Sequence, residues 1–296
     1  MTICWEWVQA MTDQATVLRQ LVARKAPQTK MRIISVTSGK GGVGKTNFTI
    51  NLGLALIDYG YRVIVMDGDL GLANVDIAFG IAPRYSLGDM IAGDKTIEEI
   101  LVTGPKGIGI LPGGSGIRDL ANLERSTLVN VLSNLGRLEK MADILIIDTG
   151  AGLGNTVLNF LRASDDIILV TTPEPTALTD AYGLLKALRP DQGDVRVGAV
   201  INRVRSETEA KASYQRLEVA VQKFLHGSLD LLGWVYDDSN VGRAVMKQEP
   251  LGISFPESSA YRCIQWIAGS IAGLYLQAPR QPLGIRGFIN SLLRSF

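Results

Sequence analysis

Ser35-Val-Thr-Ser-Gly-Lys-Gly-Gly-Val-Gly-Lys-Thr-Asn47 is the stretch that decides the fold, because it contains the pattern Gly-x-x-x-x-Gly-Lys-Thr over residues 39–46. The apolar run Met31–Val36 before it is typical of a buried strand, and Phe48–Ile57 after it is typical of a helix. Strand, glycine loop and helix in this order predict a phosphate-binding loop.

The residue types in this loop suit a phosphate ligand. Its glycines let backbone N–H groups curl around an anion, and the following helix adds the positive end of its dipole. Lys45 would supply a point charge for the β- and γ-phosphates, and the Thr46 hydroxyl would ligate Mg²⁺. The residues expected to bind nucleotide here are Gly39, Lys40, Gly41, Gly42, Val43, Gly44, Lys45, Thr46 and Asn47.

Lys40, directly after the first glycine of the loop, narrows the class of phosphate-loop protein. Lys-Gly-Gly-Val-Gly-Lys-Thr resembles the deviant Walker A loop of the MinD/ParA class of dimerising ATPases. The resemblance implies an ATP-bound homodimer in which Lys40 reaches the partner's nucleotide. The alternative is that Lys40 is a solvated loop lysine.

Two acidic residues follow the next buried strand, Tyr61–Met66. Asp67 and Asp69 stand at its carboxyl end, where α/β sheets place ligands, and two such carboxylates can face a metal and its waters. The resemblance implies that Asp69 orients or deprotonates the attacking water, making Asp69, Lys40 and Lys45 the catalytic set, while Asp67 supports Mg²⁺ through water. Helix capping is the alternative for Asp67 and Asp69.

A second acidic strand end lies further along. Ala142–Ile147 is a buried strand that ends in Asp148, followed by Thr149-Gly-Ala-Gly152, which fits a Walker B element. Asp148 would hold Mg²⁺ through water, and the glycines would sense the γ-phosphate by backbone.

The base site is expected at another strand end. Val195–Ile201 ends in Asn202-Arg203, and an amide can pair with the adenine edge through a donor and an acceptor together, a role that the resemblance implies for Asn202. The residues after Asn202 lack the aspartate that would recognise guanine, which favours ATP over GTP as the ligand. Asp237 and Asp238, after the last strand, are expected close to the base.

Continuous apolar strands alternate with helices, which predicts one α/β domain with a doubly wound, mostly parallel sheet covered on both faces. Residues 31–276 would form this domain, with a helix and linker over 1–30 and a linker and tail over 277–296. The net charge of +1 gives no overall signal for nucleic acid, and there is no apolar run of bilayer length. Cys4 and Cys263 have no metal-like spacing and indicate a reducing compartment.

The segment Asp13-Gln14-Ala15-x-x-Leu18-Arg19 resembles the N-terminal activator motif of the FlhG family, also called YlxH or FleN. This implies that Asp13, Gln14, Leu18 and Arg19 contact an FlhF-type GTPase. The alternative is a helix that docks on its own domain. Met11 is an alternative start of the chain.

The tail carries a single apolar stripe, with members spaced as on one face of a helix. These members are Ile285, Phe288, Ile289, Leu292, Leu293 and Phe296. A helix this short is marginal in water and cannot span a membrane, but it suits an anionic interface. The alternative is a tail docked in a groove of its own domain, and we expect both states to alternate.

The resemblance to the FlhG family implies a cytoplasmic ATP hydrolase of low turnover, peripheral at the inner face of the cell membrane, that sets flagellar number or position. The family implies FlhF-type GTPases and flagellar C-ring proteins as partners, and no specific nucleic acid is expected. A MinD-like factor for cell-division placement and a ParA-like DNA-partition ATPase remain alternatives. An iron–sulfur carrier of the same fold and a scaffold that binds nucleotide without turnover are the other two.

Overall fold

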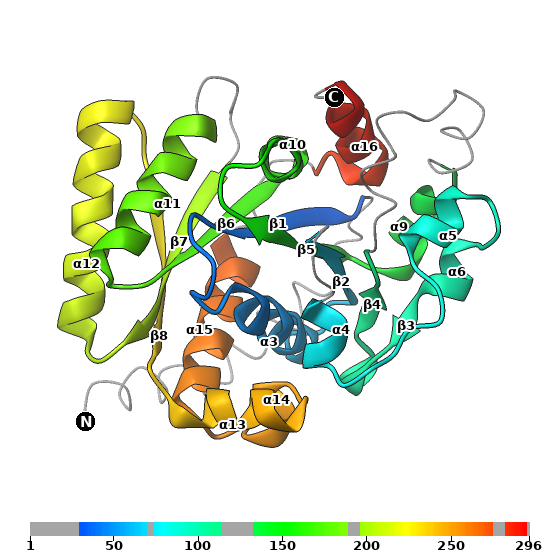
Figure 1. The fold of residues 1–296 in the computed structure, drawn as a ribbon, viewed down its shortest axis with the longest axis horizontal. Helices are drawn as coiled ribbons and strands as arrows, with labels where there is room; N and C mark the ends of the chain where they lie inside the picture. The colour runs from blue at the N-terminus through cyan, green and yellow to red at the C-terminus, as the bar shows by residue number, and fades with distance from the viewer. Residues whose placement is uncertain (1–29, 70–73, 114–132, 189–195, 275–281, 295–296) are drawn as a thin grey trace.

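The computed structural model describes residues 30–69, 74–113, 133–188, 196–274 and 282–294. Within these ranges the chain forms an eight-stranded sheet in the order β3-β4-β2-β5-β1-β6-β7-β8 (Figure 1). The strands are β1 Arg32–Ser38, β2 Val63–Gly68, β3 Val102–Thr103, β4 Gly109–Leu111, β5 Ile144–Ala151, β6 Asp166–Thr171, β7 Arg196–Val204 and β8 Asp230–Tyr236.

The predicted doubly wound, mostly parallel sheet is confirmed. All neighbouring pairs are parallel except β3 and β4, which run antiparallel at one edge. The sequence analysis did not predict β3, because a two-residue strand shows no periodicity. Strand β7 also runs further than expected, through Asn202 to Val204.

Helices follow the strands and cover both faces. The α-helices are α3 Lys45–Asp58, α4 Asn74–Ala78, α5 Leu87–Ile91, α6 Ile97–Ile100, α9 Leu138–Met141, α10 Asn155–Ala163, α11 Pro175–Leu188, α12 Glu207–Ala220, α13 Ser239–Lys247, α14 Leu251–Ser254, α15 Ser259–Leu274 and α16 Gly284–Arg294. A 3₁₀ turn spans Pro105–Gly107, and a π-turn over Val221–Leu225 extends α12. Ser86 and Thr96 begin α5 and α6 with capping boxes.

The two faces of β1 show how the layers form. Ile34 and Val36 are buried in a cluster with α3 and α15, whereas Met31 and Ile33 are buried in a cluster on the opposite face. Alternate side chains of a strand point to opposite faces, so β1, which is buried at every position, needs cover on both sides. Figure 1 shows α3 and α15 on one side of β1 and α10 and α16 on the other.

The C-terminal helix α16 is part of this second layer. Four of the predicted lipid-facing residues, Ile285, Phe288, Ile289 and Leu292, are at most 3% exposed and pack in the cluster that contains Met31. The apolar stripe is therefore docked on the domain, which is the alternative left open above, and in this structure it is not available to lipid. The side chain of Leu293 and residue Phe296 lie outside the described residues.

Candidate active site

The glycine loop connects β1 to α3 and has the backbone that its composition predicted. Gly42 and Gly44 have φ of +79° and +90°, in the left-handed region that side chains disfavour. Gly39 lies against α11, where an added Cβ would stand 2.2 Å from the backbone of Asp180. These three positions therefore require glycine, one for close packing and two for conformation.

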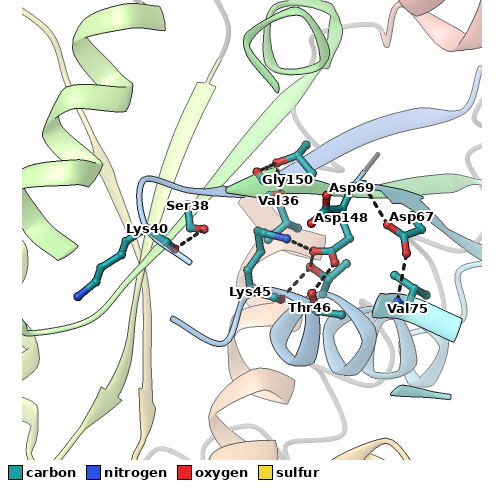
Figure 2. A network of polar contacts seen from close by, with 12 residues as sticks. Val36, Ser38, Lys40, Lys45, Thr46, Asp67, Asp69, Val75, Asp148 and Gly150 are labelled. Carbon is teal, nitrogen blue, oxygen red and sulfur yellow. Dashed lines mark hydrogen bonds and ion pairs between the residues drawn. The ribbon is translucent and has the colours of Figure 1, made fainter. Parts of the chain in front are cut away.

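Three side chains from the start of α3 converge on Asp148, which lies within β5 because this strand runs past the expected end to Ala151. Figure 2 shows Lys45 and Thr46 directed at Asp148. Lys45 Nζ lies 2.9 Å from Asp148 Oδ1, and Thr46 Oγ1 donates to Oδ2 at 2.7 Å. Thr49 Oγ1 also donates to Oδ1, at 3.0 Å. Asp148 is fully buried, so these contacts compensate its charge.

Thr49 was not predicted as a site residue. It lies one turn after Lys45 and Thr46 on the same face of α3, and that spacing could have indicated it. The register of the sheet brings the predicted site residues together, because Asp148 lies beside Val36 of β1 and Asp67 of β2.

The donor set fits a magnesium nucleotide. Among the described residues, no group of three or more His, Cys, Asp or Glu side chains could hold a metal ion by itself. Mg²⁺ commonly takes one or two protein oxygens, phosphate oxygens and water. The Thr46 hydroxyl lies 2.7 Å from Asp148, and their roles as direct ligand and water-binding group for Mg²⁺ stay a prediction.

Asp67 is almost fully buried at the end of β2 and braces the segment that follows. Its Oδ1 accepts from Asp69 N at 3.0 Å, and its Oδ2 accepts from Val75 N in α4 at 3.2 Å. The capping alternative thus describes contacts that the structure shows, and the water-mediated metal role of Asp67 stays a prediction.

Asp69 lies next to the glycine segment after β5. A Cβ on Gly150 would be 3.6 Å from Asp69 Oδ1, so this carboxylate faces the stretch expected to sense the γ-phosphate. Its role with the attacking water stays a prediction. Asp76, in α4, is 8% exposed, its Oδ1 has no hydrogen-bond partner among the described residues, and burial raises its pKa.

Lys40 points away from Lys45 in Figure 2. Its Nζ lies 3.0 Å from Glu174 Oε2 and donates to Thr176 Oγ1, also at 3.0 Å. Lys40 is partly exposed and is held here by residues of its own chain. Its contact with a partner's nucleotide stays a prediction.

The predicted base-site residues divide into two groups. Asn202 Nδ2 donates to Val43 O at 2.7 Å, so this amide contacts the phosphate loop itself. Arg203 Nε lies 3.9 Å from Asp237 Oδ1, and both side chains are exposed.

Asp238 caps two helices. Its Oδ1 accepts from Asn240 N in α13, and its Oδ2 accepts from Ser259 Oγ and Ala260 N in α15. Burial raises the pKa of Asp238, but these hydrogen bonds outweigh it and lower the pKa below its ordinary value. The place of these residues near the base stays a prediction. The predicted partner-binding residues Asp13, Gln14, Leu18 and Arg19 lie outside the described residues.

The glycine loop lies at the N-terminus of α3, and the buried Asp148 lies beside it on the neighbouring strand β5. This arrangement defines a P-loop nucleotide hydrolase. Comparison with known proteins agrees. Residues 31–194 match the AAA domain family. The solved structure of the septum site-determining protein MinD of Pyrococcus horikoshii, complexed with Mg-ADP, is 26% identical, covers 84% of this chain and 100% of that chain, and superposes with a TM-score of 0.66.

Two curated relatives match over most of their length. The antiactivator FleN of Pseudomonas aeruginosa is 36% identical over 89% of this chain and 94% of that protein. The flagellum site-determining protein YlxH of Helicobacter pylori is 32% identical over 96% of this chain and 99% of that protein. The chain belongs to the FleN/YlxH family of MinD/ParA-type P-loop ATPases, so it is an ATP hydrolase whose cofactors are ATP, ADP and Mg²⁺.

Proposed function

We propose that this chain is a dimerising ATPase switch that regulates flagellar number or placement, and that its nucleotide state decides whether α16 is docked or bound to an anionic membrane. The similarity to YlxH, a flagellum site-determining protein, supports the flagellar role. The observation that carries the switch is α16 itself, an amphipathic helix whose apolar face is buried on its own domain.

The site residues suit hydrolysis in a dimer. Bound Mg²⁺ neutralises charge on the phosphates, while Lys45 and the loop N–H groups hold them in place. Asp69 positions the attacking water, and Lys40 exchanges its contacts with Glu174 and Thr176 for the partner's nucleotide. That exchange costs little in this chain, because exposed ion pairs contribute about 0–1 kcal/mol.

The apolar face of α16 is buried against the domain, but the contact between them is incompletely packed. Phe288 stacks on Phe160 of α10 with ring centroids 6.1 Å apart. An apolar cavity of about 30 Å³ remains between α16 and the domain, lined in part by Leu138 and Phe160. A cavity of this size costs on the order of 0.7 kcal/mol at about 24 cal/mol per Å³. A helix held this way can leave when lipid offers an equivalent apolar environment.

One short helix binds a membrane weakly, but two copies in a dimer would bind strongly enough to hold the protein there. Two α16 helices on one ATP-held dimer would bind together, and tethering raises the effective concentration of the second helix. Within the described residues, no helix has both the length and the apolar character to cross a bilayer. We propose a peripheral location at the inner face of the cell membrane, reached through α16.

Liposome flotation of the full chain tests the switch. With a non-hydrolysable ATP analogue the protein should float with anionic vesicles, and with ADP it should stay in the dense fraction. Phe288→Asp should abolish flotation, whereas Phe224→Asp, at a phenylalanine that is 61% exposed, should not. Equal flotation without nucleotide, or a chain that stays monomeric in saturating Mg·ATP, would refute the proposal.

The protein partners are tested separately. Gln14→Ala should reduce the stimulation of an FlhF-type GTPase while ATP hydrolysis by this chain stays unchanged. Unaltered stimulation would remove the activator role from the N-terminal segment without touching the membrane switch. We also propose that the chain binds flagellar C-ring proteins.

A further inference from the structure

The Asn202 side chain lies directly beneath the phosphate loop. Its Nδ2 donates to Val43 O at 2.7 Å, and an added Cβ on Gly44 would be 2.5 Å from the same nitrogen. Asn202 is 9% exposed, so this contact is shielded from water. Gly44 is also the N-cap of α3, where loop and helix join.

The local backbone fixes which way the amide points. Strand β7 continues past Asn202, and Arg203 takes the left-handed conformation with φ of +59°. The register with β8 shifts between Asn202 and Val204 at this point. Arg203 N donates to Asn202 Oδ1 at 3.0 Å, so the oxygen is held by the strand and the nitrogen faces Val43.

We infer that Asn202 is a positioning residue for the phosphate loop, in addition to any contact with the base. The hydrogen bond from Asn202 fixes the direction of the Val43 carbonyl, and the amide of Asn202 fills the space beside Gly44. Loop N–H groups can bind an anion only if the peptide planes are oriented toward it, so the orientation of the peptide at Val43 matters directly. The inference rests on the loop being the phosphate site, which the family assignment gives.

The two roles of Asn202 predict different ligand dependence. A residue that only reads adenine should not affect a ligand without a base. A residue that orients the loop should affect every ligand that carries the phosphates. Inorganic tripolyphosphate with Mg²⁺ is such a base-free ligand.

The experiment compares wild type, Asn202→Ala and Asn202→Asp in the full chain, by calorimetric titration with Mg·ATP and with Mg·tripolyphosphate. We expect both substitutions to weaken both ligands by a similar factor, about tenfold for loss of one buried hydrogen bond. Gln215→Ala, at an exposed amide side chain of α12, is the matched control and should leave the affinity for both ligands unchanged. Unchanged tripolyphosphate affinity in the Asn202 variants would overturn the inference.

Hydrogen–deuterium exchange supplies a readout that needs no ligand. In the nucleotide-free protein, the amides of residues 39–46 should exchange several-fold faster in Asn202→Ala than in wild type, while those of β5 should not change. Equal loop exchange in a variant with an unchanged melting temperature would also overturn the inference. A wild-type chain that binds no nucleotide would instead contradict the ATPase assignment, and the exchange result would still decide the role of Asn202.

Discussion

Replacing Glu139 by alanine should weaken the docking of α16 on the domain, because the side chains that cap the N-terminus of this helix belong to the domain. The residues at its start, Leu283 and Gly284, have no side-chain oxygen. Glu139 Oε1 accepts from Ile285 N at 2.9 Å, and Asp165 Oδ1 accepts from Leu283 N at 2.8 Å. Both acceptors come from the domain, so the helix loses them when it undocks.

The size of the effect follows from these contacts. Loss of a capping side chain costs about 0.5–2 kcal/mol, which includes a carboxylate placed favourably at the positive end of the helix dipole. Burial of each large apolar side chain of α16 contributes about 1.5–3 kcal/mol. The four buried side chains therefore dominate docking. Removal of the cap, at about 0.5–2 kcal/mol, should lower the ratio of docked to free helix about 2- to 30-fold without unfolding the domain.

Flotation in the ADP state measures this ratio. With ADP, Glu139→Ala should bind anionic vesicles several-fold more than wild type, and with a non-hydrolysable ATP analogue the two should bind equally. Glu98→Ala is the matched control, since Glu98 pairs with Arg137 on the surface and does not contact α16. If Glu139→Ala floated no better than Glu98→Ala in ADP, with both melting temperatures unchanged, the carboxylate could not be a determinant of docking.

Four further substitutions test the site. Asp69→Ala should retain Mg·ATP binding but lose phosphate release, leaving a stable dimer by size-exclusion chromatography; wild-type turnover would remove its catalytic role. Lys40→Ala should bind ATP as a monomer, so a dimer of unchanged affinity in analytical ultracentrifugation would contradict a contact in trans. Asp148→Asn should lower kcat about 10²-fold or more, because the group beside Thr46 loses its charge, and a steady-state phosphate assay would show it. Burial raises the pKa of Asp76, so the folded state holds this proton more tightly than the unfolded state, and the free energy of unfolding should fall as pH rises above the ordinary value of 3.8. Asp76→Asn should flatten that fall in urea titrations, and an unchanged slope would show that Asp76 does not contribute.

The parts of the site that could be predicted from sequence are those fixed by local pattern. The phosphate loop follows from glycine spacing between a strand and a helix, and Asp148 follows from an acid at the end of an apolar strand. The spacing of Thr49 from Lys45 on one helix face could have indicated it, whereas Glu139 and Asp165 were missed because their roles depend on which segments lie side by side. Asp165, for example, contacts Leu283 across a sequence separation of 118 residues.

The C-terminal stripe shows a different limit. An amphipathic helix has the same sequence pattern whether its apolar face meets lipid or protein. The surface that receives α16 is built from β1, α9 and α10, and no single segment of the sequence indicates it. The pattern therefore predicted an apolar contact but could not identify the other side of that contact.

Two elements connect the nucleotide site to α16, and their surroundings suggest which one can transmit a change. Strand β1 leads into the phosphate loop and packs on α16 through Met31 and Ile33, but it is hydrogen-bonded to β5 on one side and β6 on the other. Any shift of β1 would break two parallel ladders. Helix α10 begins just after the glycine segment that faces Asp69 and carries Phe160 against Phe288. Because α10 is held on the sheet by side-chain packing rather than by ladder hydrogen bonds, we expect it to shift at lower cost than β1 if the glycine segment moves toward a bound γ-phosphate. Under the proposed switch, the ring contact between Phe160 and Phe288 would then be the first contact of α16 to change.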